Sequence, residues 1–274
     1  MYDTVVSGCS FTDPNFKSGH EDAQHLDFSF LKWPDHLSSY TGWNIKNLAR
    51  SGICNGDICN DLFDFITSDE GRDVKRCIIA ATEWTRFSLF AMNFYWQYLM
   101  GEEVTPDPWP KEWKDKWWEH PIVRFSTVHL KNILLEAGIE NKYEWACRYT
   151  TKQNLRSLAQ LEVLCSYRDI ELYYFQMLPI EGGLWITKND VWKLGDQVRT
   201  EHPIFNKIKK DHYFLTTPNS KAGYLDFWDL IKEFGDTEQL TNRDLRVSDN
   251  DHHPGALGHK MIADWVYKRI CERS

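Results

Sequence analysis

Four short apolar, strand-like runs are spaced along the chain, and stretches with helical periodicity separate them. The runs cover residues 4–6, 43–48, 77–81 and 171–177. Runs of this kind are typical of strands buried on both faces, as in a parallel sheet with helices on each side. A length of 274 residues suits one large domain. The alternation therefore predicts one α/β domain over residues 1–274, a three-layer α/β/α sandwich around a parallel sheet of about five strands.

Three stretches have the spacing of amphipathic helices. Residues 154–167 place leucines and a cysteine three or four positions apart, so they share one side of a helix. The stretch after Pro254 and Gly255 carries a broad apolar stripe, which predicts a buried final helix. Residues 57–66 are a shorter candidate.

Two long stretches lack this alternation and are predicted to be insertions. Residues 87–139 show no strand pattern, and we interpret them as a Trp-rich, mostly helical insertion over the edge of the sheet. Its tryptophans either pack the insertion onto the body of the domain or form an aromatic wall beside a binding cleft. These are Trp96, Trp109, Trp113, Trp117 and Trp118. Residues 184–236 form a second, irregular insertion.

Charge and composition exclude several classes of protein. The 40 acidic and 32 basic side chains leave a net charge of −8, which argues against a nucleic-acid binder because phosphates require a basic face. No secretory signal and no apolar run of about 18 residues is visible, so we expect a cytoplasmic protein without membrane contact. The seven scattered cysteines predict free thiols, and Cys54 and Cys59 lack the further ligands of a zinc site.

A serine follows the first predicted strand, within residues 8–12. The carboxyl end of a parallel strand faces the crevice where α/β sheets bind ligands, so Ser10 is a candidate nucleophile. Gly8 lets the backbone turn sharply there. An ordinary strand-to-helix turn has the same short pattern. The motif also differs from the Gly-x-Ser-x-Gly elbow, because Thr12 stands where that motif has its second glycine.

A glycine-bearing loop follows the second predicted strand, within residues 47–58. Gly52 allows a backbone N–H to approach a ligand closely, as an oxyanion donor must. Asn55 either caps the next helix or lines the site.

A polar segment follows the third strand, within residues 80–87. Thr82, Glu83 and Arg86 gather there as candidate substrate-binding residues. Arg86 could equally pair with a carboxylate such as Glu83.

Two acids and two histidines lie just before the final helix. Asp249, Asp251, His252 and His253 are followed by a proline, and such a cluster could orient an imidazole as a general base. Alone, the same cluster is as consistent with a helix cap or a chance metal site.

Taken in order, the four segments resemble the sequence blocks of the SGNH/GDSL hydrolase superfamily. A Gly-x-Ser motif, an Asn-x-x-x-x-Gly loop and an Asp-x-x-His-Pro block before the last helix recur there, and the match spans nearly the whole chain. The first and last blocks are the specific ones, with Gly258 four residues beyond Pro254. The first and third segments are also similar, more loosely, to small SGNH-like proteins encoded by bacteriophages. The resemblance implies a flavodoxin-like fold.

The resemblance also implies roles for individual residues. Ser10 is the expected nucleophile, and His253 is the base that deprotonates it. The backbone N–H groups of Ser10 and Gly52 are the expected oxyanion donors. Thr82 stands where the family has an asparagine that donates to the oxyanion, and threonine can donate only through its hydroxyl. No metal ion or organic cofactor is required.

The acid of the implied triad departs from the family pattern. Asn250 stands three residues before His253, where the family has an aspartate. We expect Asp251 to orient His253, with Asp249 in reserve. Pairing His252 with Asp249 would restore the spacing but would break the His-Pro step.

The resemblance implies a serine hydrolase that cleaves an ester, an O-acetyl or other acyl ester of a carbohydrate or lipid, through an acyl-Ser10 intermediate. The alternative is a catalytically weak or inactive SGNH-like module that binds through its cleft and the Trp-rich insertion, for example in a phage virion. The expected partners are a small-molecule or glycan ester and, in the alternative, other virion proteins. A nucleotide-binding Rossmann protein is disfavoured, because neither G-x-G-x-x-G nor a P-loop follows the first strand.

Overall fold

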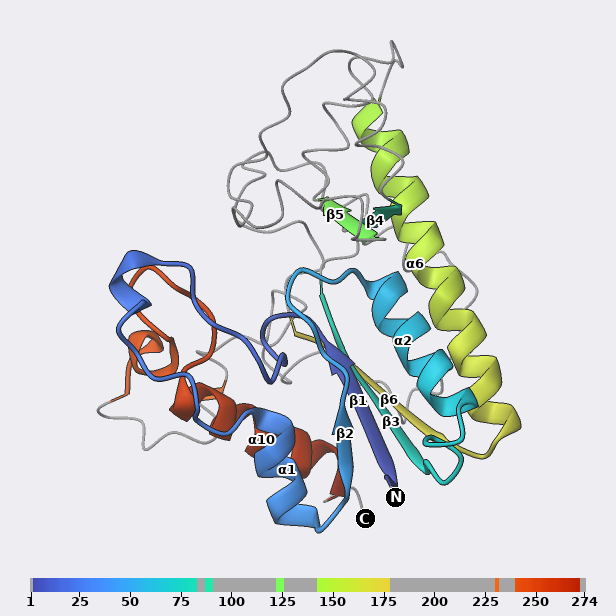
Figure 1. Cartoon of the computed structure of the whole chain (residues 1–274), viewed down its shortest axis with the longest axis horizontal. Coiled ribbons are helices and arrows are strands. Elements are labelled where there is room, and N and C mark those ends of the chain that lie inside the picture. Colours follow the sequence, from blue (N-terminus) through green and yellow to red (C-terminus); the bar gives the residue numbers. More distant parts are fainter. Residues whose placement is uncertain are drawn as a thin grey trace.

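Four parallel strands form the central sheet of the computed structural model, which describes residues 2–82, 87–90, 122–125, 142–177, 230–231 and 240–271 (Figure 1). They pair in the order β2-β1-β3-β6. Their bounds are Thr4–Gly8 for β1, Ile45–Asn47 for β2, Arg76–Ala81 for β3 and Glu171–Gln176 for β6. They coincide with the four apolar runs, so the predicted parallel sheet is confirmed, with four strands in the described residues where about five were expected.

The strand order places the ends of β1 and β3 at a switch point. From β1 the chain moves to β2 on one side, and from β3 it moves to β6 on the other. This is the order of flavodoxin-like sheets, in which the loops after the two central strands diverge and leave a crevice. β1 pairs with β3 up to Gly8 and Ala80. The residues that follow these two strands therefore emerge beside one another.

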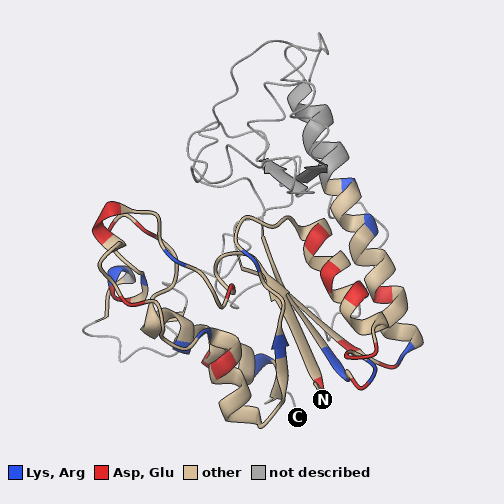
Figure 2. Ribbon diagram, viewed as in Figure 1, with Lys and Arg blue, Asp and Glu red and all other residues tan. Residues whose placement is uncertain are grey.

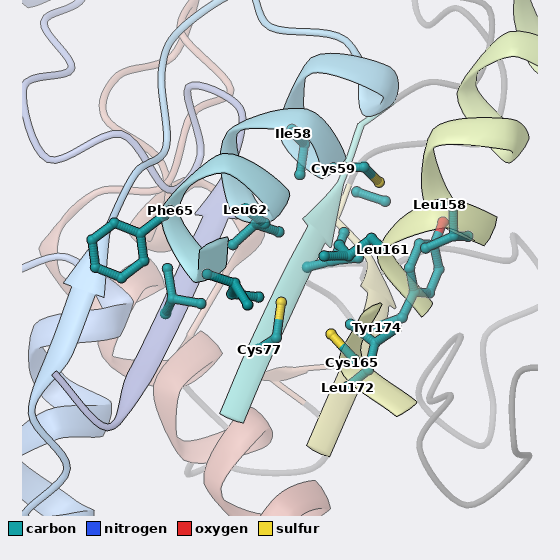
Figure 3. Close-up of a cluster of buried hydrophobic side chains, with 14 of the residues drawn as sticks. Ile58, Cys59, Leu62, Phe65, Cys77, Leu158, Leu161, Cys165, Leu172 and Tyr174 are labelled. Atoms are coloured by element: carbon teal, nitrogen blue, oxygen red, sulfur yellow. The ribbon is translucent and has the colours of Figure 1, made fainter. Parts of the chain in front are cut away.

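Helices α2 (Asn55–Thr67) and α6 (Lys142–Tyr167) cover one face of the sheet (Figures 1 and 3). Their inward side chains pack against alternate residues of the strands. This core includes Ile58, Leu62 and Ile66 of α2, Leu155, Leu158 and Leu161 of α6, and Val5, Ile79 and Tyr174 of the strands. Each fully buried Leu or Ile contributes about 1.5–3 kcal/mol by leaving water. The predicted helix over 154–167 is confirmed, although α6 already begins at Lys142.

Helices α1 (Trp33–Thr41) and α10 (Ala256–Cys271) cover the opposite face (Figure 1). Trp33 and Trp265 are 0% exposed and contact Phe175 of β6 edge-on, with ring centroids 5.6 Å and 5.4 Å from the Phe175 ring. Leu230 and Ile231, which fall within the second predicted insertion, join this core. The predicted three-layer α/β/α architecture is therefore confirmed.

Helix α1 is an element that the sequence analysis missed. Its nine residues bury a narrow apolar side, Trp33 with Leu37, so the periodicity is weak. Its start and end signals are clear in retrospect. Pro34 lies in the first turn, where a missing N–H leaves no helical bond unmade. Gly42 follows the helix with a φ of +71° and donates its N–H to the Ser38 carbonyl oxygen, a cap that favours glycine.

Two short strands lie inside the first predicted insertion. β4 (Phe87–Phe90) pairs antiparallel with β5 (Ile122–Phe125). The expectation that residues 87–139 hold no strand is therefore wrong at these two segments. They pair with each other rather than with the central sheet, so they lack the pattern of a strand buried on both faces. The five tryptophans of this insertion lie outside the described residues.

The charged residues of the sheet lie at the ends of strands and on the edge strand β2, and several acidic residues lie along α2 (Figure 2). Arg76 and Glu171 begin β3 and β6 and form an ion pair at 3.4 Å. Among the described helices, none has an apolar stretch long enough to cross a lipid bilayer. Among the described cysteines, Cys9, Cys54, Cys59, Cys77 and Cys165 are buried, and Cys271 is exposed.

Candidate active site

The hydroxyl of Ser10 lies 2.7 Å from Nε2 of His253, although the two residues are 243 positions apart in the chain. Ser10 follows β1 and is half-buried, and His253 precedes α10. Ser10 thus lies at the end of a strand of the central sheet, and His253 lies just before a helix that packs on one face of that sheet. The fold thus brings together the first and last of the four sequence segments, within reach of proton transfer.

The other ring nitrogen of His253 contacts Asp251. Nδ1 lies 2.5 Å from Asp251 Oδ1, and the same oxygen accepts the backbone N–H of His253 at 3.0 Å. Asp251 is 1% exposed. Its own backbone N–H donates to the hydroxyl of Ser248 at 3.0 Å. Hydrogen bonds therefore hold both the side chain and the backbone of Asp251, and its carboxylate lies on the side of the His253 ring that faces away from Ser10.

The surroundings of Asp251 keep it ionised. Burial opposes ionisation, but hydrogen bonds from the His253 ring, the Ser18 side chain and the His253 backbone outweigh it and lower the pKa of the Asp251 carboxyl below its ordinary value. An ionised carboxylate only accepts hydrogen bonds, so Nδ1 of His253 must carry a proton. In the neutral imidazole, Nε2 is then the acceptor for the Ser10 hydroxyl. This is the tautomer that a general base requires.

The loop before α10 is closed by backbone hydrogen bonds. Val247 donates to the carbonyl oxygen of His253 at 2.8 Å, and Gly255 donates to that of Leu245 at 2.8 Å. Gly258 makes this closure possible, because a Cβ there would lie 2.3 Å from the Leu245 carbonyl oxygen. The glycine noted four residues beyond the proline thus lets the start of α10 press against the preceding backbone.

The turn that carries Ser10 needs a glycine before it for space. The N–H groups of Thr12 and Asp13 both donate to the Cys9 carbonyl oxygen, which closes the turn. A Cβ at Gly8 would lie 2.7 Å from the Thr12 hydroxyl and 3.0 Å from the Ala80 carbonyl oxygen. Gly8 lies within the strand and is not a residue of positive φ. The prediction that Gly8 makes a sharp backbone turn is therefore wrong, and glycine is required there because a side chain would not fit.

The turn after β2 carries Gly52, which has a φ of +73°. Here glycine is favoured by the backbone conformation itself. The Arg50 N–H donates to the Gly8 carbonyl oxygen at 3.1 Å, and Ser51 is bound by Asp13, so this turn lies against the turn of Ser10. Within the described residues, no protein acceptor binds the backbone N–H of Ser10 or of Gly52. Both N–H groups are available to a ligand.

Asn55 and Thr82 bind each other rather than facing the crevice. The Asn55 side chain donates to the Thr82 carbonyl oxygen at 2.9 Å and accepts the Thr82 N–H at 2.8 Å. Both residues are buried, at 1% and 0% exposed. Asn55 is the first residue of α2 and Cys54 is its N-cap, so Asn55 neither caps the helix nor lines the site. It ties the start of α2 to the end of β3, and Thr82 is withdrawn from solvent.

The other candidate residues lie apart from Ser10 or beyond the described part. Asp249 is exposed and pairs with Arg243 at 3.5 Å. His252 is exposed, and its Nε2 lies 3.3 Å from Arg246. The structure therefore does not bring the alternative pair of His252 and Asp249 to the serine. Glu83 and Arg86 lie outside the described residues.

The loop of residues 9–32 supplies site contacts that sequence reasoning missed. Phe16 stacks on the His253 ring and is 8% exposed. Asp22 accepts hydrogen bonds from the backbone and side chain of Asn250, at 3.2 Å and 3.1 Å. Figure 1 shows this loop lying against the loop that precedes α10. An asparagine at 250 suits this contact, because an aspartate there would face the Asp22 carboxylate. No periodic pattern in the sequence marks these contacts.

Metal ligation finds no support in the described residues. No three His, Cys, Asp or Glu side chains are grouped there in a way that could hold a metal ion. Cys54 and Cys59 belong to α2 and its cap, and both are buried.

Comparisons with known proteins give distant similarities. No protein-family model and no curated protein sequence matches the chain. Among solved structures, a G-D-S-L family protein described as lipolytic, from Desulfitobacterium hafniense, is 13% identical with a TM-score of 0.46, covering 98% of this chain and 99% of that one. A catalytic mutant of an acetylxylan esterase from Geobacillus stearothermophilus is 12% identical with a TM-score of 0.43, covering 98% and 94%. An esterase from Pseudoalteromonas is 13% identical with a TM-score of 0.41, covering 98% and 97%. At these scores and identities, no activity follows for this chain from the similarity.

Proposed function

We propose that this protein is a serine ester hydrolase of the SGNH type. The observation that supports it is the continuous contact from the Ser10 hydroxyl through the His253 ring to the buried Asp251 carboxylate. This arrangement of nucleophile, base and orienting acid is recognised by geometry rather than by sequence position.

The first step forms an acyl-enzyme. His253 Nε2 takes the proton of the Ser10 hydroxyl while Oγ attacks the ester carbonyl carbon. The negative charge that develops on the carbonyl oxygen is stabilised by the backbone N–H groups of Ser10 and Gly52. The ester C–O bond then breaks, and His253 returns its proton to the leaving alcohol. Asp251 stabilises the imidazolium that exists between these two proton transfers.

The second step releases the acid. His253 takes a proton from a water molecule, and the resulting hydroxide attacks the acyl carbon on Ser10 Oγ. The same two N–H groups bind the second oxyanion. When the C–Oγ bond breaks, the proton returns to Ser10 and the free enzyme is regenerated. We propose an O-acetyl or other acyl ester of a carbohydrate or lipid as the substrate.

A fluorophosphonate probe tests this proposal directly. We expect the wild-type protein to be labelled at Ser10, to hydrolyse p-nitrophenyl acetate, and to lose both properties in Ser10→Ala. The variant should keep its melting temperature, because Ser10 is a small, half-buried residue of a turn. Hydrolysis that persists unchanged in purified Ser10→Ala would contradict the mechanism.

One observation favours a second candidate, a weak or inactive SGNH-like binding module such as a virion component. Thr82 occupies the position of the family's third oxyanion donor, and it is 0% exposed with its backbone groups bound by Asn55. Removing one oxyanion donor typically costs about 10²–10³ in rate. A protein that is folded but is neither labelled nor active supports this candidate instead.

A further inference from the structure

The carboxylate of Asp13 joins the two turns on which the proposed oxyanion donors lie. Its Oδ2 accepts the Ser51 backbone N–H at 2.7 Å and the Ser51 hydroxyl at 2.6 Å. Its Oδ1 accepts the Asn15 N–H at 2.8 Å, and its own N–H donates to the Cys9 carbonyl oxygen. Asp13 is therefore tied to the turn of Ser10 by its backbone and to the turn of Gly52 by its side chain.

Asp13 is buried, which makes the contact strong and selective. It is 8% exposed, and three donors converge on its two oxygens. The ammonium of Lys32, which is 2% exposed, interacts favourably with the Asp13 carboxylate from the protein interior. A buried carboxylate with a compensating cation holds its hydrogen bonds more firmly than an exposed one.

We propose that Asp13 is a positioning residue that holds the Gly52 N–H in the direction of the oxyanion. This inference rests on the proposed function. Ser51 immediately precedes Gly52, which has a φ of +73°. Glycine has no Cβ to restrict its backbone, so the direction of its N–H must be fixed by the neighbouring residues. Fixing the Ser51 N–H and hydroxyl therefore fixes the start of the peptide unit that carries the Gly52 N–H. Asp13 acts on the reaction only through this turn.

An amide cannot replace the carboxylate in this position. Asparagine has the same shape, but it offers one oxygen and an NH₂ group that only donates. With its oxygen on Ser51 the amide turns its NH₂ group toward the Asn15 N–H, and with its NH₂ group on Ser51 it faces the Ser51 backbone N–H, so one backbone donor loses its acceptor either way. Asp13→Asn therefore breaks at least one of these contacts and removes the charge that acts on Lys32, while keeping the volume of the side chain.

The test compares Asp13→Asn with Ser51→Ala and with the control Asp61→Asn. Asp61 pairs with Arg50, one residue before Ser51, and is not part of the Asp13 contacts. We measure kcat and KM with p-nitrophenyl acetate, and amide hydrogen exchange of residues 49–53. Asp13→Asn should lower kcat about 30- to 100-fold with KM within twofold, because an oxyanion donor acts in the transition state. Exchange in residues 49–53 should rise. Asp61→Asn should leave kcat unchanged.

The graded variant keeps the proposal testable if Asp13→Asn does not fold. Ser51→Ala loses the hydroxyl contact but keeps the backbone one, so kcat should fall about three- to tenfold at unchanged KM. An active wild type whose kcat is unaffected in both Ser51→Ala and a folded Asp13→Asn overturns the positioning role and leaves the proposed function intact. A wild type that is neither active nor labelled by the fluorophosphonate overturns the proposed function, and this inference with it.

Discussion

The ring of Phe16 lies on the imidazole of His253, with 4.2 Å between the ring centroids and 28° between the ring planes. Phe11, next to the nucleophile, contacts the same imidazole at 4.8 Å. Two aromatic rings of one loop therefore restrict how the proposed base can tilt. Stacked aromatic pairs contribute about 0.5–1.5 kcal/mol beyond the area they bury.

Phe16→Leu should slow the reaction more than it destabilises the fold. Leucine fills much of the volume, so the free energy of unfolding should fall by less than about 1.5 kcal/mol. The imidazole loses its stacking partner, and we expect kcat to fall about tenfold. Kinetics with p-nitrophenyl acetate and thermal melting separate the two effects. Phe28→Leu is the control, because Phe28 contacts Phe16 edge-on at 5.9 Å and does not stack on His253. Equal kinetic losses in both variants would refute a specific role for Phe16.

Asp251→Asn should abolish most activity at neutral pH, whereas Asp249→Asn should not. A neutral amide offers the imidazolium no compensating charge and can turn its NH₂ group toward Nδ1, which favours the wrong tautomer; this loss of the orienting acid costs about 10⁴ in kcat in an active triad. Asp249 is exposed and paired with Arg243, so its neutral variant is the matched control. The measurement is kcat at pH 7.5 for both variants. If Asp249→Asn proves the inactive one, the acid has been assigned to the wrong residue.

The stability that Asp251 contributes depends on pH in a defined direction. The pKa of Asp251 is lowered in the folded protein, so its contribution is present above the unfolded value near 4 and is lost as the pH falls further. In the range from pH 5 to 8 this carboxyl stays ionised, and it adds no slope to the stability.

His259 should make the protein less stable in mild acid. The Nδ1 atom of His259 accepts the backbone N–H of Trp33 at 3.2 Å, and His259 is 2% exposed. Burial and the nearby Lys32 ammonium lower the pKa of His259 to about 3. Between pH 6.5 and 3 the unfolded chain thus binds one more proton than the fold at this residue. The contribution of His259 to stability should therefore fall with decreasing pH by about 1.4 kcal/mol per unit in that window.

The comparison with His259→Gln isolates this contribution. Glutamine is neutral and can still accept the Trp33 N–H, so the variant should lose less stability on acidification than the wild type. Urea unfolding from pH 4.5 to 8 gives the two curves. Above pH 7 they should run parallel, and below 6.5 they should converge or cross. Curves that stay parallel throughout would mean that His259 does not titrate in this way.

Asn250→Asp should lower the melting temperature and fail to raise activity. The new carboxylate would lie beside Asp22, which now accepts two hydrogen bonds from Asn250, and like charges repel. The double variant Asp22→Asn, Asn250→Asp restores an amide–carboxylate pair and should recover most of the loss. A double-mutant cycle in melting temperature measures this coupling. Simple additivity of the two changes would contradict the contact between the loops.

The sequence predicted those parts of the fold that are covered on both faces. β1 and β3 are flanked by strands and helices, so nearly all of their residues are buried and most are apolar. Helix α1 was not predicted because its buried apolar residues, Trp33 and Leu37, form too narrow a stripe to give a clear helical periodicity. Strands β4 and β5 were not predicted because, in the described residues, they pair only with each other and lack the sequence pattern of the central strands.

The candidate site was predictable where short motifs carry it. Ser10, His253 and Asp251 lie together as expected, because each stands next to an element whose end the topology fixes. The place of Asn55 was not predictable, since its partner is the backbone of Thr82 and backbone groups leave no trace in a sequence. Phe16 and Asp13 belong to an irregular loop, where the spacing of residues in the sequence does not predict which way their side chains point.

The 243 positions between Ser10 and His253 also set an order of events during synthesis. At about 5–20 residues per second, the ribosome needs roughly ten to fifty seconds to pass from the serine to the histidine. During that time the serine has no base beside it and is an ordinary hydroxyl. The proposed reactivity of Ser10 can therefore arise only once α10 has been made and has docked on the sheet. A chain released before that point would carry the nucleophile without the means to activate it.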